Sequence, residues 1–121
     1  MTTRAELKRE YKEMPKEAGV FQIRNTANGR VYLGSSLNLH GPLNKHRFML
    51  SHGMHDVPLL QKEWNAFGPD AFVFEVLEVV ERRETPDFRI EDELELLEEI
   101  WLDKLQPIGD KGYNRNRRIR E

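Results

Sequence analysis

Two short, mainly apolar runs, Val20 to Arg24 and Arg30 to Leu33, are rich in β-branched and aromatic residues. Between them lies Asn28-Gly29, a pair that readily adopts the positive φ angles of a tight turn. The pattern predicts a β-hairpin whose second strand ends at Gly34 to Ser36.

After Leu39 the apolar residues take the spacing of a helix, because Leu43 and Leu50 fall on one side of it. Pro42 has no amide to bond to a preceding turn, so we expect it to be the first helical residue, and we expect Ser51 to Gly53 to close the helix. A second helix is predicted to begin at Pro58 and to end before Gly68-Pro69.

The stretch Ala71 to Val80 places Phe72, Phe74 and Val76 on one face and is predicted to be a third strand beside the hairpin. A polar loop, residues 81–89, precedes the longest predicted helix. That helix spans Ile90 to Leu105, with an apolar stripe at spacings of three and four. The expected fold is α+β, a three-stranded, largely antiparallel sheet flanked by helices.

With 121 residues, the chain has room for one domain, residues 1–121. Thr3-x-x-Glu6 predicts a short surface helix over about residues 3–13, and residues 115–121 form a basic tail. No apolar run approaches the roughly 20 residues of a bilayer span and no signal-peptide core is present, so a cytoplasmic protein is expected. The absence of cysteine excludes disulfides, thiolate metal sites and thiol nucleophiles.

Two triplets on the predicted hairpin resemble a known nuclease signature. Gly19-Val20-Phe21 and Tyr32-Leu33-Gly34, followed by Ser-Ser-x-Asn, are similar to the GIY and YIG triplets of the GIY-YIG nuclease superfamily. The resemblance continues through His46, Leu96 to Trp101 and Gly112-Tyr113-Asn114, and is especially close to the catalytic domains of phage-intron homing endonucleases. It implies the GIY-YIG fold and divalent-metal-dependent cleavage of DNA.

The resemblance also implies roles for particular residues. Glu98 matches the family glutamate that holds a single Mg²⁺ or Mn²⁺, and Tyr32, His46, Glu98 and Asn114 match catalytic positions. The residues themselves allow plainer interpretations: a strand tyrosine that packs, a turn asparagine after Gly112, and one more acid on an acidic helix. Glu98 nevertheless lies close to the buried stripe of its helix, where a carboxylate must be solvated, paired or ligated.

Two positions depart from the family pattern. Phe21 replaces the first tyrosine, the favoured proton acceptor, and Pro42 falls where the family has a phosphate-binding arginine. Losing an electrostatic donor costs a factor of about 10² to 10³ in rate. Losing a general base costs about 10² to 10⁴. We therefore expect impaired cleavage unless Lys45 or Arg47 supplies the missing charge.

Three histidines, His46, His52 and His55, raise the alternative of a metal cluster. A glycine intervenes and only Asp56 lies at ligand spacing, so surface histidines are the favoured interpretation of the trio, and no role is assigned to His55.

The net charge of −2 does not favour a nucleic-acid partner, but the basic tail does. Arg115, Arg117 and Arg118, with Lys45 and Arg47, are the candidate phosphate-binding residues, and the tail has the alternative of being a solvated terminus.

Three functions remain open. The first is a Mg²⁺- or Mn²⁺-dependent DNA endonuclease with impaired cleavage, and the second is an inactive GIY-YIG module that binds nucleic acid or a protein partner. The third is an interaction domain without nucleic-acid contact, favoured by the acidic run Glu91 to Glu99. Homing enzymes carry a DNA-recognition segment after the catalytic domain, and this chain is too short for one, so a protein partner is expected to supply any specificity.

Overall fold

The computed structural model describes residues 16–121, so the helix expected near residues 3–13 lies outside the described residues. The elements follow in the order β1 (Gly19–Asn25), β2 (Val31–Ser36), α2 (His40–Ser51), α3 (Pro58–Phe67), the 3₁₀ turn η1 (Pro69–Ala71), β3 (Phe72–Val79), α4 (Ile90–Leu105) and η2 (Gly109–Lys111). The predicted C-terminal end of α2 and both predicted ends of α3 and α4 are confirmed, and Pro58 occupies the first turn of α3, where a missing amide costs no bond.

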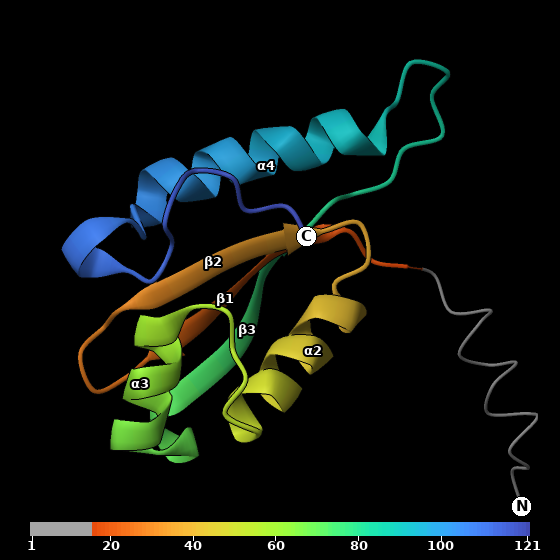
Figure 1. The fold of residues 1–121 in the computed structure, drawn as a ribbon. Helices are drawn as coiled ribbons and strands as arrows, with labels where there is room; N and C mark the ends of the chain where they lie inside the picture. The colour runs from red at the N-terminus through yellow and green to blue at the C-terminus, as the bar shows by residue number, and fades with distance from the viewer. Residues whose placement is uncertain (1–15) are drawn as a thin grey trace, which may run out of the picture.

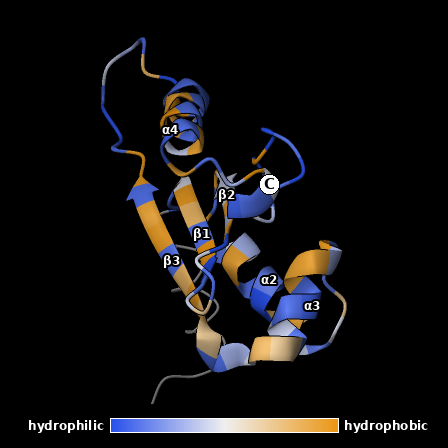
Figure 2. Ribbon diagram, turned by 90° about the vertical axis from the view of Figure 1, so that its left-hand side faces the viewer, coloured by the Kyte–Doolittle hydropathy of each residue, from blue (hydrophilic) through white to orange (hydrophobic). Residues whose placement is uncertain are grey.

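The three strands form one antiparallel sheet in the order β2-β1-β3, which confirms the α+β prediction. Helix α4 covers one face of the sheet, and α2 and α3 lie against the other (Figure 1). In Figure 2, turned by 90°, α4 again lies apart from α2 and α3, which stay together. Side chains of β2 therefore alternate between an α4 face and an α2 face, and this alternation decides where each candidate site residue points.

Each face of the sheet has its own hydrophobic cluster. Under α4 the buried members are Ala18, Val20, Leu33, Val80, Leu94, Leu102 and Ile119. Under α2 and α3 they are Ile23, Leu50, Leu60, Trp64, Phe72 and Tyr113. Leu33 and Tyr32, neighbours on β2, contact opposite clusters, as the pleat requires.

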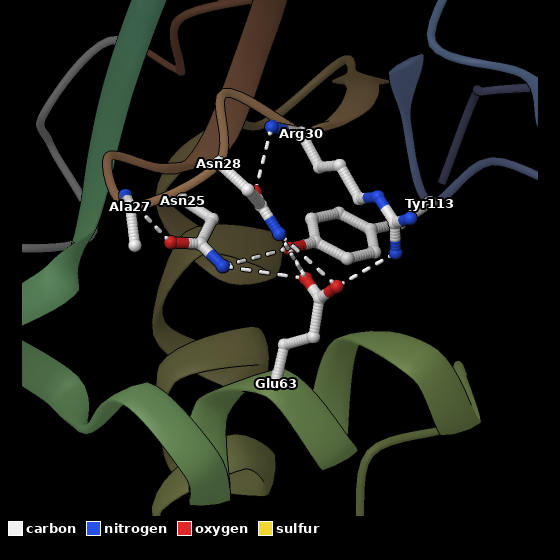
Figure 3. Close-up of polar contacts among 6 residues, drawn as sticks. All are labelled: Asn25, Ala27, Asn28, Arg30, Glu63 and Tyr113. Atoms are coloured by element: carbon white, nitrogen blue, oxygen red, sulfur yellow. Dashed lines mark hydrogen bonds and ion pairs between the residues drawn. The ribbon is translucent and has the colours of Figure 1, made fainter. Parts of the chain in front are cut away.

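A buried polar network ties the hairpin turn to α3. Glu63 is 8% exposed and accepts hydrogen bonds from Asn25, Asn28, Arg30 and the Tyr113 hydroxyl (Figure 3). Burial by itself raises the pKa of Glu63, but the bonds from Tyr113, Asn28 and Asn25 and the charge of Arg30 outweigh it. The pKa of this carboxyl therefore lies below its usual value.

Two local predictions were wrong. Helix α2 begins at His40, two residues before Pro42, because the first amides of any helix lack an internal partner and a proline there removes no bond. In the hairpin turn only Gly29 has a positive φ; Asn28 does not. The Asn28 side chain instead accepts a bond from the Arg30 amide and donates to Glu63.

Within residues 16–121, no helix combines the length and the apolar character that a membrane span requires.

Candidate functional site

Four rings gather on the α2 face of β1 and β2, and we call Phe21, Tyr32, His46 and His55 the aromatic cluster. Ring centroids lie 5.0 Å apart for Tyr32 and His46, 5.7 Å for Phe21 and His46, and 4.9 Å for the stacked His46 and His55. Phe21 is fully buried and its ring lies over Gly34, since a Cβ on Gly34 would overlap the phenyl Cζ. The glycine of the second triplet is therefore what admits the ring.

Hydrogen bonds define the proton positions on the two histidines of the aromatic cluster. The Val57 amide donates to Nδ1 of His55, so neutral His55 carries its proton on Nε2. That Nε2 lies 2.7 Å from Nδ1 of His46, which must accept. His46 then carries its own proton on Nε2, and this N–H donates to the Glu121 carboxylate at 2.8 Å. The chain of bonds makes His46 a hydrogen-bond donor into the site.

Electrostatics reinforce these assignments. Burial lowers the pKa of His55 to about 4, together with the positive charge that neighbouring His46 carries when it is protonated. His55 is therefore neutral at physiological pH. Burial, with the adjacent charge of Glu121, raises the pKa of Tyr32 far above its ordinary value. Tyr32 is therefore a hydroxyl, not a phenolate, and it donates to Glu121 at 3.4 Å.

Glu98 lies on the other face of the sheet, where its α4 position brings it to β2. Its side chain is only 12% exposed, accepts a hydrogen bond from the Ser35 hydroxyl, and pairs with Arg120 through both carboxylate oxygens at 2.9 and 3.0 Å. These bonds, with the acidic residues nearby, raise the pKa of Arg120. The predicted position of Glu98 beside the buried stripe of α4 is confirmed. Of the three states expected for such a carboxylate, the structure shows the paired one.

Asn114 occupies the outer edge of β2. Its amide group accepts from the Leu33 N–H and donates to the Leu33 C=O, both at 2.8 Å, and so replaces a neighbouring strand. Of the four predicted catalytic residues, Tyr32 and His46 are in ring contact. Glu98 and Asn114 reach the same strand, from the opposite face and from the edge.

Comparisons with known proteins agree with this arrangement. No family model matches the chain. A solved structure of the catalytic domain of the homing endonuclease I-TevI is 31% identical, with a TM-score of 0.58, over 82% of this chain and 98% of the other. The chain belongs to the GIY-YIG nuclease superfamily. A mutant of the same catalytic domain of intron endonuclease I-TevI gives a TM-score of 0.63 at 26% identity, over 87% of this chain and 99% of that one.

The curated relative is longer than this chain. Intron-associated endonuclease 1 of Enterobacteria phage T4 is 31% identical over 98 residues, which are 81% of this chain and 36% of the relative. The GIY-YIG domain described here thus spans about a third of that protein, and it corresponds to a homing-endonuclease-like catalytic domain.

The predicted phosphate-binding residues do not form one cluster and have separate surroundings. Arg117 pairs with Asp103 at 3.1 Å, and Arg115 donates to the Asp56 carbonyl at 3.0 Å. Arg47 lies over the Phe74 ring, 4.6 Å from its centroid. Lys45 and Arg118 are exposed.

The interpretation of the histidine trio as surface residues was wrong for His46, which is 5% exposed. It holds for His52, which stacks on Phe48 at the end of α2. No group of three or more His, Cys, Asp or Glu side chains in residues 16–121 is arranged to hold a metal ion.

Sequence reasoning missed three residues of the site: His55, Arg120 and Glu121. His55 carried a signal, because it lies in a loop nine residues after His46 and precedes an acid and a proline-initiated helix. Arg120 and Glu121 carried none, because only the fold returns residues 119–121 to β2, where the Ser35 amide donates to the Ile119 carbonyl and the Glu121 amide to the Ser35 carbonyl.

Proposed function

We propose that this GIY-YIG domain is a divalent-metal-dependent DNA endonuclease module whose cleavage is impaired. The observation that carries the impairment is the hydrogen-bond state of the aromatic cluster. Phe21 has no polar atom, Tyr32 is a neutral hydroxyl, and His46 directs an N–H into the site. His55 uses its one acceptor nitrogen on the Val57 amide. The two imidazoles therefore have no unoccupied acceptor nitrogen for an attacking water, and a neutral Tyr32 hydroxyl is too weak a base to take its proton.

The donor chemistry at Glu98 fits the cation that the family uses. Mg²⁺ prefers oxygen ligands, keeps several waters and needs only one or two carboxylates, and here a carboxylate lies beside the Ser35 hydroxyl. When bound, a divalent cation supplies charge that neutralises a phosphate and lowers the pKa of a coordinated water. Glu98 is the proposed ligand, with Mg²⁺ or Mn²⁺ as the ion.

The remaining side chains bind and orient the phosphodiester in this proposal. The His46 Nε2–H and the Tyr32 hydroxyl donate to phosphate oxygens, and His55 holds the His46 ring in its tautomer. Asn114 aligns β2 through Leu33. Pro42, in the first turn of α2, contributes neither charge nor donor, and the neighbouring Arg47 is engaged by Phe74.

A nicking assay tests the proposal. Supercoiled plasmid and single-stranded DNA are incubated with Mn²⁺ or Mg²⁺ and the natural chain, the double variant Phe21→Tyr/Pro42→Arg, and each of these with Glu98→Ala. We expect slow or no cutting by the natural chain, a gain of about 10² or more in the double variant, and loss of all cutting with Glu98→Ala. Equal rates in the natural and repaired chains would contradict the impairment.

The second candidate is an inactive module that binds nucleic acid, and the exposed cations of the tail favour it. It predicts that Glu98→Ala changes nothing in the natural chain, and that charge removal at Arg115, Arg117 and Arg118 weakens DNA binding and flattens its salt dependence. A module that binds only a protein partner would show neither DNA response.

A further inference from the structure

The segment Ile119–Glu121, which we call the 119–121 segment, lies along the outer edge of β2. It contacts both halves of the site, Glu98 on the α4 face and the aromatic cluster on the α2 face. Its backbone pairs with Ser35 through bonds of 2.9 and 2.8 Å, and the Ile119 side chain is buried under α4. In Figure 1 this part of the chain runs from beside α4 to the end of β2, where the letter C marks it. The segment is thus anchored to β2 by an isolated β-bridge and is not a loose tail.

Arg120 occupies the cation position of the site. Its guanidinium engages both oxygens of Glu98, and a third bond of 3.2 Å reaches the Glu91 carbonyl. The Ser35 hydroxyl takes a further position on the Glu98 carboxylate. A metal ion at Glu98 would therefore have to compete with a guanidinium of like charge for this carboxylate.

Glu121 occupies the anion position of the site. Its carboxylate accepts from Nε2 of His46 through both oxygens, at 2.8 and 2.9 Å, and from the Tyr32 hydroxyl. One oxygen lies 3.0 Å from the place of a Cβ on Gly34, beside the buried Phe21 ring. The donors proposed to bind a phosphate are therefore already bound to a carboxylate.

We propose that the 119–121 segment is an internal competitive ligand that closes the site: Arg120 stands in for the divalent cation and Glu121 for the DNA phosphate. This inference rests on the proposed function of the same site. Opposite charges on consecutive residues match the opposite charges of the two ligands, so binding of cation and phosphate together displaces both. Because the side chains of Arg120 and Glu121 are 36% and 28% exposed, the ion pair of Arg120 with Glu98 and the hydrogen bonds that Glu121 accepts are weak enough to exchange.

The same contacts suggest an opposite role, in which Glu121 replaces the base lost at Phe21 and Arg120 the charge lost at Pro42. Two observations favour closure. Arg120 pairs with both oxygens of the carboxylate that the cation needs, and Glu121 places a negative charge where the phosphate must approach. The opposite role is distinguished by the sign of the response to substitution.

The cation half is tested by Mn²⁺ binding to the full chain, followed by electron paramagnetic resonance of free Mn²⁺ and by broadening of amide signals near Glu98. Arg120→Gln is compared with Arg24→Gln, which removes the same charge from an exposed pair with Glu75 between β1 and β3. We expect Arg120→Gln to bind Mn²⁺ about 5- to 50-fold more tightly. Arg24→Gln should bind as the natural chain does, and adding Glu98→Gln to Arg120→Gln should abolish binding.

The anion half is tested by fluorescence anisotropy with a short random-sequence DNA duplex. Glu121→Gln should bind more tightly than Glu75→Gln, although both changes remove one negative charge. Hydrogen exchange gives an independent measure: Mn²⁺ and duplex together should expose the Ser35 and Glu121 amides, whose bonds hold the segment to β2.

Each outcome decides between the alternatives. Equal Mn²⁺ affinity in the natural chain and Arg120→Gln, lost in both with Glu98→Gln, would overturn closure and leave the proposed function intact. No Mn²⁺ binding in any variant would overturn the metal site and closure together. Slower nicking by Arg120→Gln/Glu121→Gln than by the natural chain would establish the opposite, catalytic role.

Discussion

Replacing Gly34 with alanine tests the packing that forms the floor of the site. An ideal Cβ at this position overlaps Cζ and Cε1 of Phe21, and it lies 3.0 Å from a carboxylate oxygen of Glu121. Phe21 is fully buried, with the rings of Tyr32 and His46 at 6.5 and 5.7 Å, so its phenyl ring has no free direction in which to move.

Overpacking of this kind costs about 1 to 3 kcal/mol. For a domain of 121 residues, 1 kcal/mol corresponds to about 4 °C in Tm, so we expect Gly34→Ala to unfold about 4 to 12 °C below the natural chain. Differential scanning calorimetry measures the change. Gly41→Ala is the matched control, because nothing lies within 4 Å of its new Cβ and alanine is the better helix former in α2.

A double-mutant cycle identifies the cause. Phe21→Leu removes Cζ, so the penalty of Gly34→Ala should shrink by about 1 kcal/mol or more in the Phe21→Leu background. An unchanged Tm for Gly34→Ala, or an equal penalty in both backgrounds, would refute the claim that this glycine is needed to admit the ring.

Three further outcomes follow from the polar contacts. Glu63→Gln places an amide N–H donor among the donors that now bind the carboxylate, and it should lower the free energy of unfolding by about 2 kcal/mol or more. Glu75→Gln, in the exposed pair with Arg24, should lower it by less than about 1 kcal/mol. Equal losses of stability in urea denaturation would argue against the buried network. Asn114→Ala removes two bonds to Leu33 and should lower stability by about 1 to 3 kcal/mol at constant m-value, and an unchanged midpoint would exclude a role in holding β2. His55 has a pKa lowered to about 4, so between about pH 6.5 and 4 the unfolded chain binds a proton that the folded chain does not, and stability falls as pH falls. His55→Gln should lose less stability than the natural chain between pH 7 and 4.5, and parallel losses would show that His55 does not titrate in this way.

Closure by the 119–121 segment would change how the nicking assay is read. If Arg120 and Glu121 cover Glu98 and His46 in the resting state, then Phe21→Tyr/Pro42→Arg restores chemistry in a site that the segment still closes. The repaired chain with Arg120→Gln/Glu121→Gln should then cut faster than the repaired chain alone. The two deficits, missing groups and an occupied site, are separated by comparing four chains: the natural chain, the repaired chain, and each of these with Arg120→Gln/Glu121→Gln.

The local pattern of the sequence determined the elements and their order. Helix α4 has the predicted bounds, Ile90 to Leu105, because its apolar residues recur at helical spacing between a polar loop and Pro107. Pro58 and Gly68 mark the ends of α3 for equally local reasons, a missing amide and a positive φ. The triplets of the hairpin indicated the superfamily, and with it a carboxylate at position 98.

The tertiary structure alone decided which chemical groups meet. Strand pleating sends Tyr32 and Leu33 to opposite faces, so Glu98 and His46 approach β2 from different sides, a relation that spacing along the chain does not contain. From the sequence alone, residues 120 and 121 are compatible with a solvated tail. In the structure, backbone bonds to Ser35 bring Arg120 to Glu98 and Glu121 to His46. Partners in a folded protein depend on long-range packing, and a local pattern carries no information about a contact 75 residues away in the chain.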